Sequence, residues 1–342
     1  MYVNNNFKLM NRMKIFFFLL CALASFSLHS QSAFQQHGKL KLIGTQLCDQ
    51  NNKPVQLKGM STHGLQWHGW GTFLNEKNMD VLAHQWQADI LRIAMYYDEG
   101  GYKSNPKKFT TMVDTLVEES HKRGLYSIVD WHILKPGDPW KRIEEAKIFF
   151  DYMSKKHAQK GSVLYEICNE PNGKNIDWPR IKSYAEEIIP IIRKNDPDGI
   201  ILIGTPDWAS LGLSGDKVAH DIITKPLDKQ TAHNVMFSFH FYAASHGKTY
   251  RDGFKQFLGK APLFITEWGS QEASGEGKND WHSVKEWHKI LDQHKISWCN
   301  WNYSPGHRSS AVWKQGTTAK GPFNDQQLKE SGRKVKQLIL AK

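Results

Sequence analysis

Two glutamates occupy positions where a carboxyl group could take part in catalysis. Glu170 closes the stretch VLYEICNE and is followed by Pro171, whereas Glu267 follows LFIT and is followed by Trp268 and Gly269. Apolar and β-branched runs of this length predict buried strands, and a proline predicts the end of a strand. Two carboxyl groups at strand ends could cleave an acetal such as a glycosidic bond, one as proton donor and one as the carboxylate that meets the oxocarbenium-like transition state. These patterns leave open which glutamate plays which part.

The segments that must position these acids alternate along the whole chain. Amphipathic stretches with helical spacing separate the strand-like runs, and several end in Gly or in Asn-Asp-Pro. No Pro-rich or Ser-rich linker interrupts the alternation. We count eight strand-like runs: VQLKGM, ILRIAMYY (90–97), LYSIVDWH (125–132), VLYEICNEP, IILIGTP (200–206), VMFSFHFYA (235–243), LFITEWG and SWCNWNY (297–303).

Eight strand–helix units in one chain predict an α/β fold, a parallel (β/α)8 TIM barrel. Residues 39–60 predict a short hairpin around Asn51 and Asn52 that leads into the first strand. A doubly wound open sheet is the alternative fold, but it favours a Gly-rich phosphate turn after an early strand, and no G-x-G-x-x-G occurs there.

In such a barrel the active site lies at the C-terminal ends of the strands. A single Arg, His or aromatic residue at one of these ends is commonly structural, as an ion-pair partner or part of the core. The gathering of many polar and aromatic side chains favours a binding site instead. Besides the two glutamates, the residues expected there are His63, Trp67, Arg92, Tyr96, His132, Asn169, Trp208, His240, Tyr242 and Trp301.

The first residues resemble a secretory signal. Lys8, Arg12 and Lys14 precede the apolar run 15–28, which is short for a membrane span, and small residues follow. We therefore expect a signal peptide at 1–31, a single catalytic domain at 32–342, and a secreted protein without a stable membrane anchor. An anchored segment is the alternative.

Charge and cysteine content indicate neither a nucleic-acid partner nor a cofactor. Residues 1–30 carry three basic residues and no acidic ones, so their removal lowers the formal net charge from +11 to +8. The remaining Lys and Arg are spread along the helical segments, which is typical of a solvated surface. Cys48, Cys168 and Cys299 are odd in number and lack CxxC spacing, which argues against a disulfide framework and against a zinc site. Cys168 and Cys299 lie in apolar strand-like runs, where we expect small buried thiols.

Seven motifs together resemble glycoside hydrolase family 5, most closely its bacterial endoglucanases, over about residues 40–338. They are GMSTHGLQWHG, LRIAMYYDEGGY, VDWHIL, YEICNEPNG, FSFHFYAASHG, LFITEWG and WCNWNYS. The resemblance implies a retaining hydrolase of β-1,4-glucans without metal or organic cofactor.

The resemblance also implies roles for individual residues. Glu170 of the NEP motif would be the acid/base, and Glu267 of the EWG motif would be the nucleophile. Asn169 would bind the sugar 2-hydroxyl. Arg92 and Tyr242 would hold Glu267, and His132 and His240 would line the same subsite. Trp301 would stack against the sugar beside the cleavage point. His63 and Trp67 would bind on the glycone side, and Trp208 on the aglycone side.

One segment departs from the family pattern. After the last strand, relatives carry a lysine and an acidic residue that bind glycone sugars, whereas this chain reads SPGHRSSAVW, where Arg308 could substitute. The preferred polysaccharide is therefore left open, with a mannanase or mixed-linkage glucanase as the alternative. We expect a monomer. Because the sequence shows no linker to a carbohydrate-binding module, we also expect better action on soluble or amorphous glucan than on crystalline cellulose.

Two hypotheses from other functional classes remain. A non-catalytic carbohydrate-binding barrel would retain the tryptophans but lose a carboxylate, and both glutamates are present. A metallohydrolase would need a cluster of ligands such as H-E-x-x-H, and the sequence has none.

Overall fold

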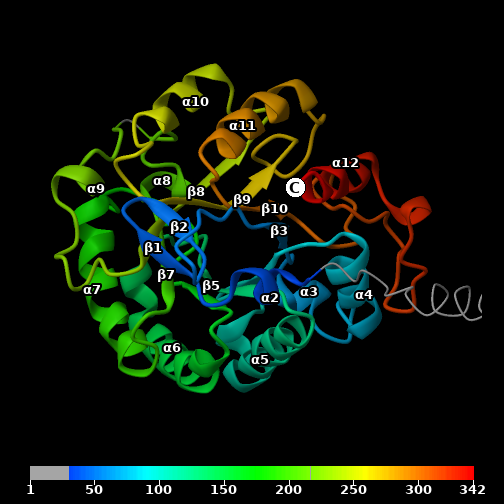
Figure 1. Cartoon of the computed structure of the whole chain (residues 1–342), viewed down its shortest axis with the longest axis horizontal. Coiled ribbons are helices and arrows are strands. Elements are labelled where there is room, and N and C mark those ends of the chain that lie inside the picture. Colours follow the sequence, from blue (N-terminus) through cyan, green and yellow to red (C-terminus); the bar gives the residue numbers. More distant parts are fainter. Residues whose placement is uncertain (1–30, 216) are drawn as a thin grey trace, which may run out of the picture. The chain divides into compact units, whose positions relative to one another are not determined.

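Eight parallel strands close into a barrel in the computed structural model, which describes residues 31–215 and 217–342 (Figure 1). The signal peptide expected at the N-terminus lies outside these residues, apart from Gln31. The strand order around the barrel is β10-β3-β4-β5-β6-β7-β8-β9, which confirms the predicted (β/α)8 fold and excludes the open sheet. The barrel strands are β3 (Lys58–Ser61), β4 (Ile90–Tyr96), β5 (Tyr126–His132), β6 (Val163–Glu166), β7 (Ile200–Gly204), β8 (Val235–Tyr242), β9 (Leu263–Gly269) and β10 (Trp298–Trp301).

Helices surround the barrel (Figure 1). The longest are α5 (Pro106–Lys122), α6 (Ile143–His157), α7 (Trp178–Asn195), α11 (Trp281–Gln293) and α12 (Glu330–Leu340). The shorter ones are α2 (Ala33–His37), α3 (Leu65–His68), α4 (Glu76–Asp80), α8 (Pro206–Ala209), α9 (Asp221–Thr224) and α10 (Lys248–Lys255), and a π-helical segment covers Val81–Gln85. Short 3₁₀ segments cover Tyr102–Ser104, Pro139–Arg142, Ala158–Lys160 and Asp325–Gln327.

The sequence of α5 shows why these helices form and how they dock. The side chain of Asn105 accepts a hydrogen bond from the N–H of Lys108, and Pro106 occupies the first turn, where it requires no N–H partner. One face of the helix then buries Phe109, Val113, Leu116 and Val117. This helical spacing places an apolar stripe against the barrel.

Strand β4 illustrates how the barrel separates its core from its site. Leu91, Ile93 and Met95 belong to the large core between strands and helices. Ile90 belongs instead to the core that the N-terminal hairpin covers, and Ala94 and Tyr96 belong to a small cluster at the opposite end. Because successive side chains of a strand point to opposite faces, Arg92 shares the inner face with Ile90 and Ala94.

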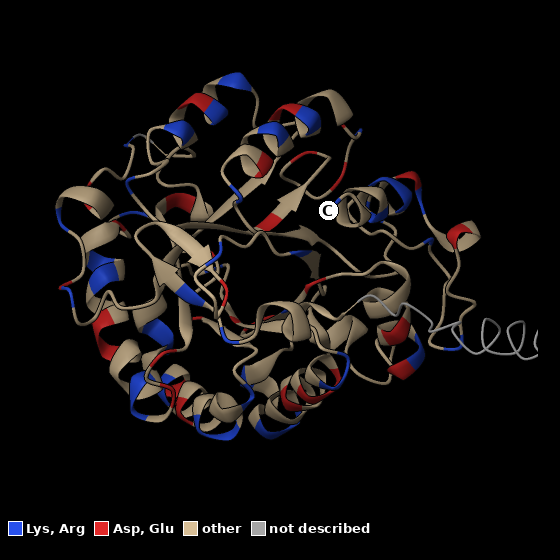
Figure 2. Cartoon of the chain, in the orientation of Figure 1, with Lys and Arg blue, Asp and Glu red and all other residues tan. Residues whose placement is uncertain are grey.

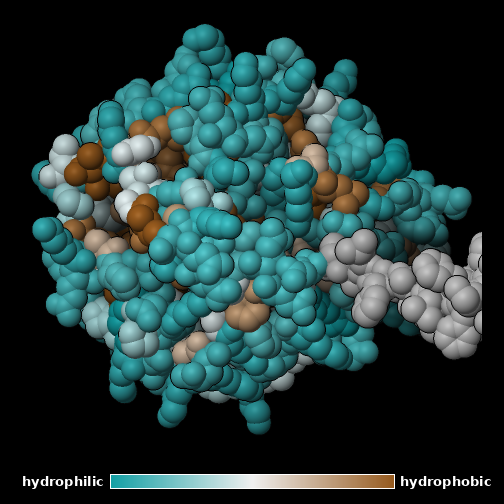
Figure 3. All heavy atoms as spheres, viewed as in Figure 1, coloured by the Kyte–Doolittle hydropathy of each residue, from teal (hydrophilic) through white to brown (hydrophobic). Residues whose placement is uncertain are grey.

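The N-terminal hairpin consists of β1 (Lys41–Ile43) and β2 (Gln46–Cys48), paired antiparallel. The hairpin turns at Gly44, whose φ of 61° suits glycine. The sequence had predicted this turn around Asn51 and Asn52. The expected position carries a second tight turn, with one antiparallel bridge between Cys48 and Pro54. Leu47 of the hairpin packs against residues at the starts of the barrel strands. Figures 1 and 3 view the hairpin face, whose surface is largely hydrophilic.

Residues of both charges are spread along the surrounding helices (Figure 2). Lys147 of α6, for example, lies 3.0 Å from the carboxylate of Glu187 of α7. This arrangement agrees with the predicted solvated surface. Among the described residues, every helix is too short or too polar to cross a bilayer. Cys48, Cys168 and Cys299 are free and buried, which confirms the burial predicted for Cys168 and Cys299.

Candidate active site

A cleft of about 1070 Å³ opens at the C-terminal ends of the strands. Ten of the twelve residues predicted from the sequence line it: His63, Trp67, Tyr96, His132, Glu170, Trp208, His240, Tyr242, Glu267 and Trp301. They come from strands or strand ends spread around the whole barrel. The structure therefore brings together side chains that lie up to about 240 positions apart in the sequence.

Arg92 and Asn169, the other two predicted residues, lie beneath the cleft and have no exposed surface. The five N–H groups of the Arg92 guanidinium meet acceptors from five residues. These contacts join Nε to Glu166 (2.7 Å), Nη1 to Ser61 (3.3 Å) and Glu267 (3.1 Å), and Nη2 to Asn169 (2.5 Å) and Asp130 (2.9 Å). A buried cation is tolerated only when paired in this way. Arg92 is therefore the electrostatic centre of the floor.

Glu170 stands four residues beyond the end of β6, and not directly at the strand end. The intervening segment folds against Gly204 of β7, whose N–H donates to the carbonyl of Cys168 at 3.0 Å. A Cβ on Gly204 would lie 2.3 Å from that carbonyl oxygen, so only glycine allows this approach. Asn172 then donates to the carbonyl of Glu170 at 2.7 Å. These contacts fix the backbone that carries the acid.

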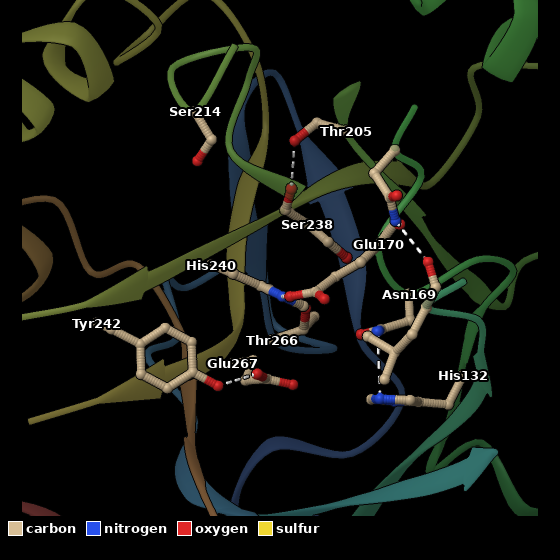
Figure 4. A network of polar contacts seen from close by, with 12 residues as sticks. His132, Asn169, Glu170, Thr205, Ser214, Ser238, His240, Tyr242, Thr266 and Glu267 are labelled. Carbon is tan, nitrogen blue, oxygen red and sulfur yellow. Dashed lines mark hydrogen bonds and ion pairs between the residues drawn. The ribbon is translucent and has the colours of Figure 1, made fainter. Parts of the chain in front are cut away.

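The carboxyl group of Glu170 faces His240, whose Nδ1 lies 2.7 Å from Oε1 (Figure 4). Burial raises the pKa of Glu170 to about 8; Arg92 opposes this effect, whereas Asp130 and Glu166 add to it. Burial lowers the pKa of His240 to about 4, so its ring is neutral. A protonated Glu170 can therefore donate to Nδ1, while Nε2–H donates to Thr266 at 2.8 Å.

Glu267 receives hydrogen bonds from both sides. Arg92 donates to its Oε2 at 3.1 Å, and the hydroxyl of Tyr242 donates to its Oε1 (Figure 4). Burial raises the pKa of Glu267, whereas His240, Arg92 and Tyr242 act in the opposite direction. Donors to both oxygens favour the ionised form, so of the two glutamates this one is built to carry the negative charge.

The two carboxyl groups share one space above the barrel. One oxygen of Glu170, one oxygen of Glu267 and a ring nitrogen of His240 all lie within 4.8 Å of one another. Strands β6 and β9 are separated by β7 and β8, so they do not lie directly across the barrel from each other. The glutamates meet because Glu170 follows a loop that crosses β7, while Glu267 lies within β9.

Aromatic rings line one side of the cleft in a continuous group. His132 stacks between Tyr96 and Trp301, with ring centroids 4.0 and 5.6 Å away. His63 contacts Trp301 and Trp67 at 5.1 and 5.0 Å. The indole of Trp67 is 41% exposed, which is unusual for so large an apolar ring. Flat apolar rings at the edge of a cleft are suited to the apolar faces of sugars.

Trp208 borders another part of the cleft in a strained backbone conformation. Its φ of 65° lies in the left-handed region, and its N–H donates to the carbonyl of Pro171 at 3.1 Å. The Nζ of Lys135 lies 5.6 Å from its ring centroid. Bulky residues adopt such a φ rarely and at a cost of about 1–2 kcal/mol. Strain of this kind is typical of functional sites.

Loops that our sequence predictions left out complete the wall of the cleft. Arg308 donates to the carbonyl of Ser274 at 3.0 Å and lies 3.4 Å from the carboxylate of Glu276. Lys329 holds this wall from behind, because its Nζ meets the carbonyls of three consecutive residues, 306–308, at 2.7, 3.3 and 2.7 Å. His68, His246 and His307 also line the cleft. Of these residues, only Arg308 was singled out from the sequence; His68 and His246 lie within the quoted motifs, and His307 precedes Arg308, but none of the three was given a role.

Within the described ranges, two groups of side chains offer atoms close enough to hold a cation. One consists of Glu170, His240 and Glu267. The other consists of Asp114, Glu118 and His157 on the outer helices α5 and α6. In the second group Lys156 and Lys160 already meet the two carboxylates at 2.5 and 2.8 Å, which indicates an ion-pair network between helices.

Known proteins share this sequence and this architecture. The family model "Cellulase (glycosyl hydrolase family 5)" matches residues 48–307. The chain is 46% identical to endoglucanase MaCel5A of Microbulbifer sp. over 309 residues, which are 90% of this chain and 59% of that protein. It is also 46% identical to endoglucanase E-5 of Thermobifida fusca over 303 residues, or 88% of this chain and 64% of that protein. The chain thus spans about three-fifths of the length of these relatives.

A solved structure has the same barrel over almost the whole length. The catalytic domain of Thermobifida fusca endoglucanase Cel5A, crystallised with cellotetraose, superposes with a TM-score of 0.86 at 44% identity, and covers 91% of this chain and 100% of that one. A carboxyl pair above the C-terminal ends of the strands, an aromatic cleft and these matches agree. The chain belongs to glycosyl hydrolase family 5.

Proposed function

We propose that this protein is a secreted, retaining endo-β-1,4-glucanase that hydrolyses internal bonds of cellulose-type glucans. The observation that carries the proposal is the close approach of two differently hydrogen-bonded carboxyl groups, whose nearest oxygens lie within 4.8 Å across an open cleft. Carboxyl groups about 5 Å apart suit a covalent glycosyl–enzyme intermediate, whereas inversion requires about 6.5–9.5 Å to admit a water molecule.

In the first step of the proposed reaction, Glu267 attacks the anomeric carbon. Its carboxylate is held by Arg92 and Tyr242, so it is charged and oriented before the sugar arrives. Glu170, protonated because burial raises its pKa to about 8, gives its proton to the glycosidic oxygen as the C–O bond breaks. The aglycone leaves as an alcohol, and the glycone remains attached to Glu267 as an ester.

In the second step, ionised Glu170 removes a proton from a water molecule that attacks the same carbon. The ester bond breaks, Glu267 regains its negative charge and Glu170 regains its proton. Two displacements at one carbon retain the β-configuration. The neutral ring of His240 accepts from protonated Glu170 at Nδ1 and donates to Thr266 through Nε2–H. These two contacts hold the carboxyl group of Glu170 close to that of Glu267.

We assign the remaining predicted residues to binding. Trp301 and His132 form a stacked surface beside the two carboxyl groups. His63 and Trp67 extend this surface on the glycone side, with Tyr96 behind them, and Trp208 supplies the aglycone side. Asn169 remains our choice for the 2-hydroxyl group of the sugar, although its complete burial requires the hydroxyl to reach the floor of the cleft.

We further propose that residues 1–31 are a cleaved secretory signal, that residues 32–342 form one catalytic domain, and that the domain acts as a monomer. Ser32–Lys342 form one compact unit, which supports the boundary. Removal of the signal would leave Ser32 as the capping residue of α2, where its hydroxyl accepts from Gln35.

The experiment that tests the proposal is hydrolysis of a β-1,4-glucan oligomer series, with the anomeric configuration of the new reducing ends followed by NMR. We expect β-products that later mutarotate, and internal cleavage of the longer oligomers. Initial α-products would overturn the retaining mechanism. Faster hydrolysis of mannan or mixed-linkage glucan in a parallel polysaccharide panel would overturn the assigned substrate.

A further inference from the structure

The floor of the cleft contains a carboxyl group to which neither step of the proposed reaction assigns a role. Asp130 is completely buried at the C-terminal part of β5, and its Oδ2 lies 2.7 Å from Nδ1 of His132 and 2.9 Å from Nη2 of Arg92. His132 in turn places Nε2 3.2 Å from Nδ2 of Asn169, the residue that precedes Glu170 (Figure 4). The three side chains form a chain that ends at Asn169, the neighbour of Glu170 in the sequence.

We propose that Asp130 is a positioning residue: by accepting the Nδ1–H of His132 it stabilises one imidazole tautomer, and that tautomer holds the side-chain amide of Asn169, the residue before Glu170, in its place in the floor of the cleft. The proposal rests on the proposed function only for the role of Glu170. The order of donors and acceptors follows from the contacts themselves.

Arg92 determines the orientation of the Asn169 amide. A guanidinium has only donors, so the Asn169 atom that lies 2.5 Å from its Nη2 is the oxygen Oδ1. The amide nitrogen therefore points the other way, where it meets the carbonyl of Ile133 and Nε2 of His132, each at 3.2 Å. Both of its hydrogens are directed at these two atoms, so Nε2 must be an acceptor.

The state of the His132 ring then follows. Burial holds the pKa of His132 well below its usual value, so the ring is neutral and has a single N–H. Because Nε2 accepts, that hydrogen is on Nδ1 and points at Asp130. In the Nε2–H tautomer, the ring N–H would face an N–H of the Asn169 amide at 3.2 Å. To accept this hydrogen with its oxygen, the amide would have to flip, which would turn its nitrogen towards the donors of Arg92.

Stacking alone does not select this arrangement. Tyr96 and Trp301 lie almost parallel to the ring of His132, at interplanar angles of 20° and 16°. Parallel rings fix the plane of the imidazole, but a half-turn about its Cβ–Cγ bond, or a shift of the hydrogen, leaves that plane unchanged. An acceptor beside Nδ1 stabilises the state in which Nε2 accepts from Asn169, and Asp130 is that acceptor.

The charged groups around Asp130 are consistent with this role. Arg92 shares Oδ2, and Glu166 is the residue paired with Asp130 in the register of β5 and β6. Burial raises the pKa of Asp130 to about 7, with Arg92 opposing the change. What the chain of hydrogen bonds needs from Asp130 is an oxygen lone pair, which a neutral amide can also supply.

Two variants separate the acceptor from the charge. Asp130→Asn keeps an oxygen that can take the place of Oδ2, whereas Asp130→Leu has a similar shape and no acceptor. We expect Asp130→Asn to keep most of the kcat and Asp130→Leu to lose about 100-fold, the scale of a misplaced catalytic group, with a smaller change in KM. Equal losses in both variants, or an unchanged kcat in Asp130→Leu, would overturn the proposal.

A double-mutant cycle tests whether the effect passes through the amide. If Asp130 acts through Asn169, Asp130→Leu should cost much less in an Asn169→Ala background than in the wild type. A full, additive loss in that background would show that Asp130 acts elsewhere.

Histidine-selective ¹⁵N NMR of the wild-type protein supplies a measurement that requires neither turnover nor a foldable Asp130→Leu variant. His132 is assigned by its absence from the spectrum of His132→Gln. We expect the Nδ1–H tautomer in the wild type and in Asp130→Asn, and loss of that single state in Asp130→Leu. An Nε2–H tautomer in the wild type would refute the proposal even if the enzyme is fully active, and an Nδ1–H tautomer would support it even if no glucan is hydrolysed.

Discussion

His240 and Glu170 are joined by a 2.7 Å contact between Nδ1 of the ring and Oε1 of the carboxyl group. Since the ring of His240 is neutral, with a pKa lowered to about 4 by burial, the hydrogen in this contact comes from the carboxylic acid. The contact therefore favours protonated Glu170 and supports the pKa of about 8 that burial produces.

The first prediction concerns the alkaline limb of the pH profile. Because the reaction needs protonated Glu170, kcat/KM should fall above about pH 8, by about tenfold for each further unit. The profile of the free enzyme on a soluble cellooligosaccharide measures this. On a dinitrophenyl cellobioside, whose leaving group needs no proton, the wild type and Glu170→Gln should both lack this limb, whereas on the cellooligosaccharide the surface variant His84→Gln should keep it. A wild-type profile that stays flat to pH 10 would contradict the assignment.

The second prediction concerns stability. The pKa of Glu170 is about 8 in the folded protein and near 4.5 in an unfolded chain, so the folded state binds the proton more tightly. Its stabilising contribution is complete below about pH 4.5 and is lost as the pH rises to about 8. Glu170→Gln removes this loss, so its Tm should exceed that of the wild type at pH 8, by about 3 °C for each kcal/mol gained, and approach it at pH 4.5.

Thermal unfolding of both proteins across this pH range measures the effect. Glu330→Gln, a change of the same kind on the surface of α12, is the control and should show no such divergence. A Tm difference that does not depend on pH would mean that Glu170 has the same pKa in the folded and unfolded states.

A third prediction distinguishes the roles of the two glutamates. Glu267→Ala opens space on one face of the anomeric carbon, so azide should enter there and give an α-glycosyl azide from an activated β-glycoside. Glu170→Ala keeps the nucleophile, so azide should replace water in the second step and give a β-glycosyl azide. The products are identified by NMR. The opposite pairing of variant and product would exchange the two roles.

The fourth prediction concerns metal ions. Glu170, His240 and Glu267 place their ligand atoms within 4.8 Å of one another, which suits Zn²⁺. We expect micromolar to millimolar Zn²⁺ to inhibit the enzyme in competition with substrate, and EDTA to restore the rate. EDTA alone should leave the activity unchanged, because the two glutamates suffice for the chemistry. Activity that EDTA abolishes and Zn²⁺ restores would reverse this view.

The fifth prediction concerns the wall formed by the loops after β9 and β10. Arg308 joins these loops, and its guanidinium is half exposed towards the cleft. Arg308→Met should raise the KM for soluble glucan by about tenfold, the scale of one hydrogen bond to a charged group, with little change in kcat. Arg308→Lys should recover only part of the loss, since it lacks the planar fork.

The matched measurement for this prediction is Tm. Arg308 and Glu276 are 51% and 54% exposed, and exposed ion pairs contribute little to stability, so both variants should unfold near the wild-type temperature. A large drop in Tm would assign Arg308 to holding the loops and not to binding sugar.

The fold was predictable because strands and helices repeat with their own periods. All eight strands lie within or overlap the apolar runs, and the same pattern carries Glu267 directly on β9. Glu170 was found through its motif, but the crossing of its loop over β7 depends on the absence of a side chain at Gly204, which no periodicity reveals.

Burial at the floor of the site was not predictable in the same way. Arg92 and Asn169 were expected to bind substrate, yet neither reaches the surface of the cleft. Their environment is set by hydrogen-bond acceptors on four other strands. The sequence pattern of a single strand does not predict which residues of other strands lie beside it. Asp130 and His132 lie two residues apart on β5, but the contact of His132 with Asn169 becomes visible only when β5 is placed beside the segment that follows β6.

The hairpin at the opposite end of the barrel has a practical consequence. Leu47 and its neighbours seal the starts of the strands, and α2 begins beside them. A surface or carrier coupled just ahead of Ser32 would therefore attach to the sealed end and leave the cleft pointing away from the support. Immobilisation through this end should preserve access for a long polymer, whereas attachment through lysines of the loops near the cleft should obstruct it.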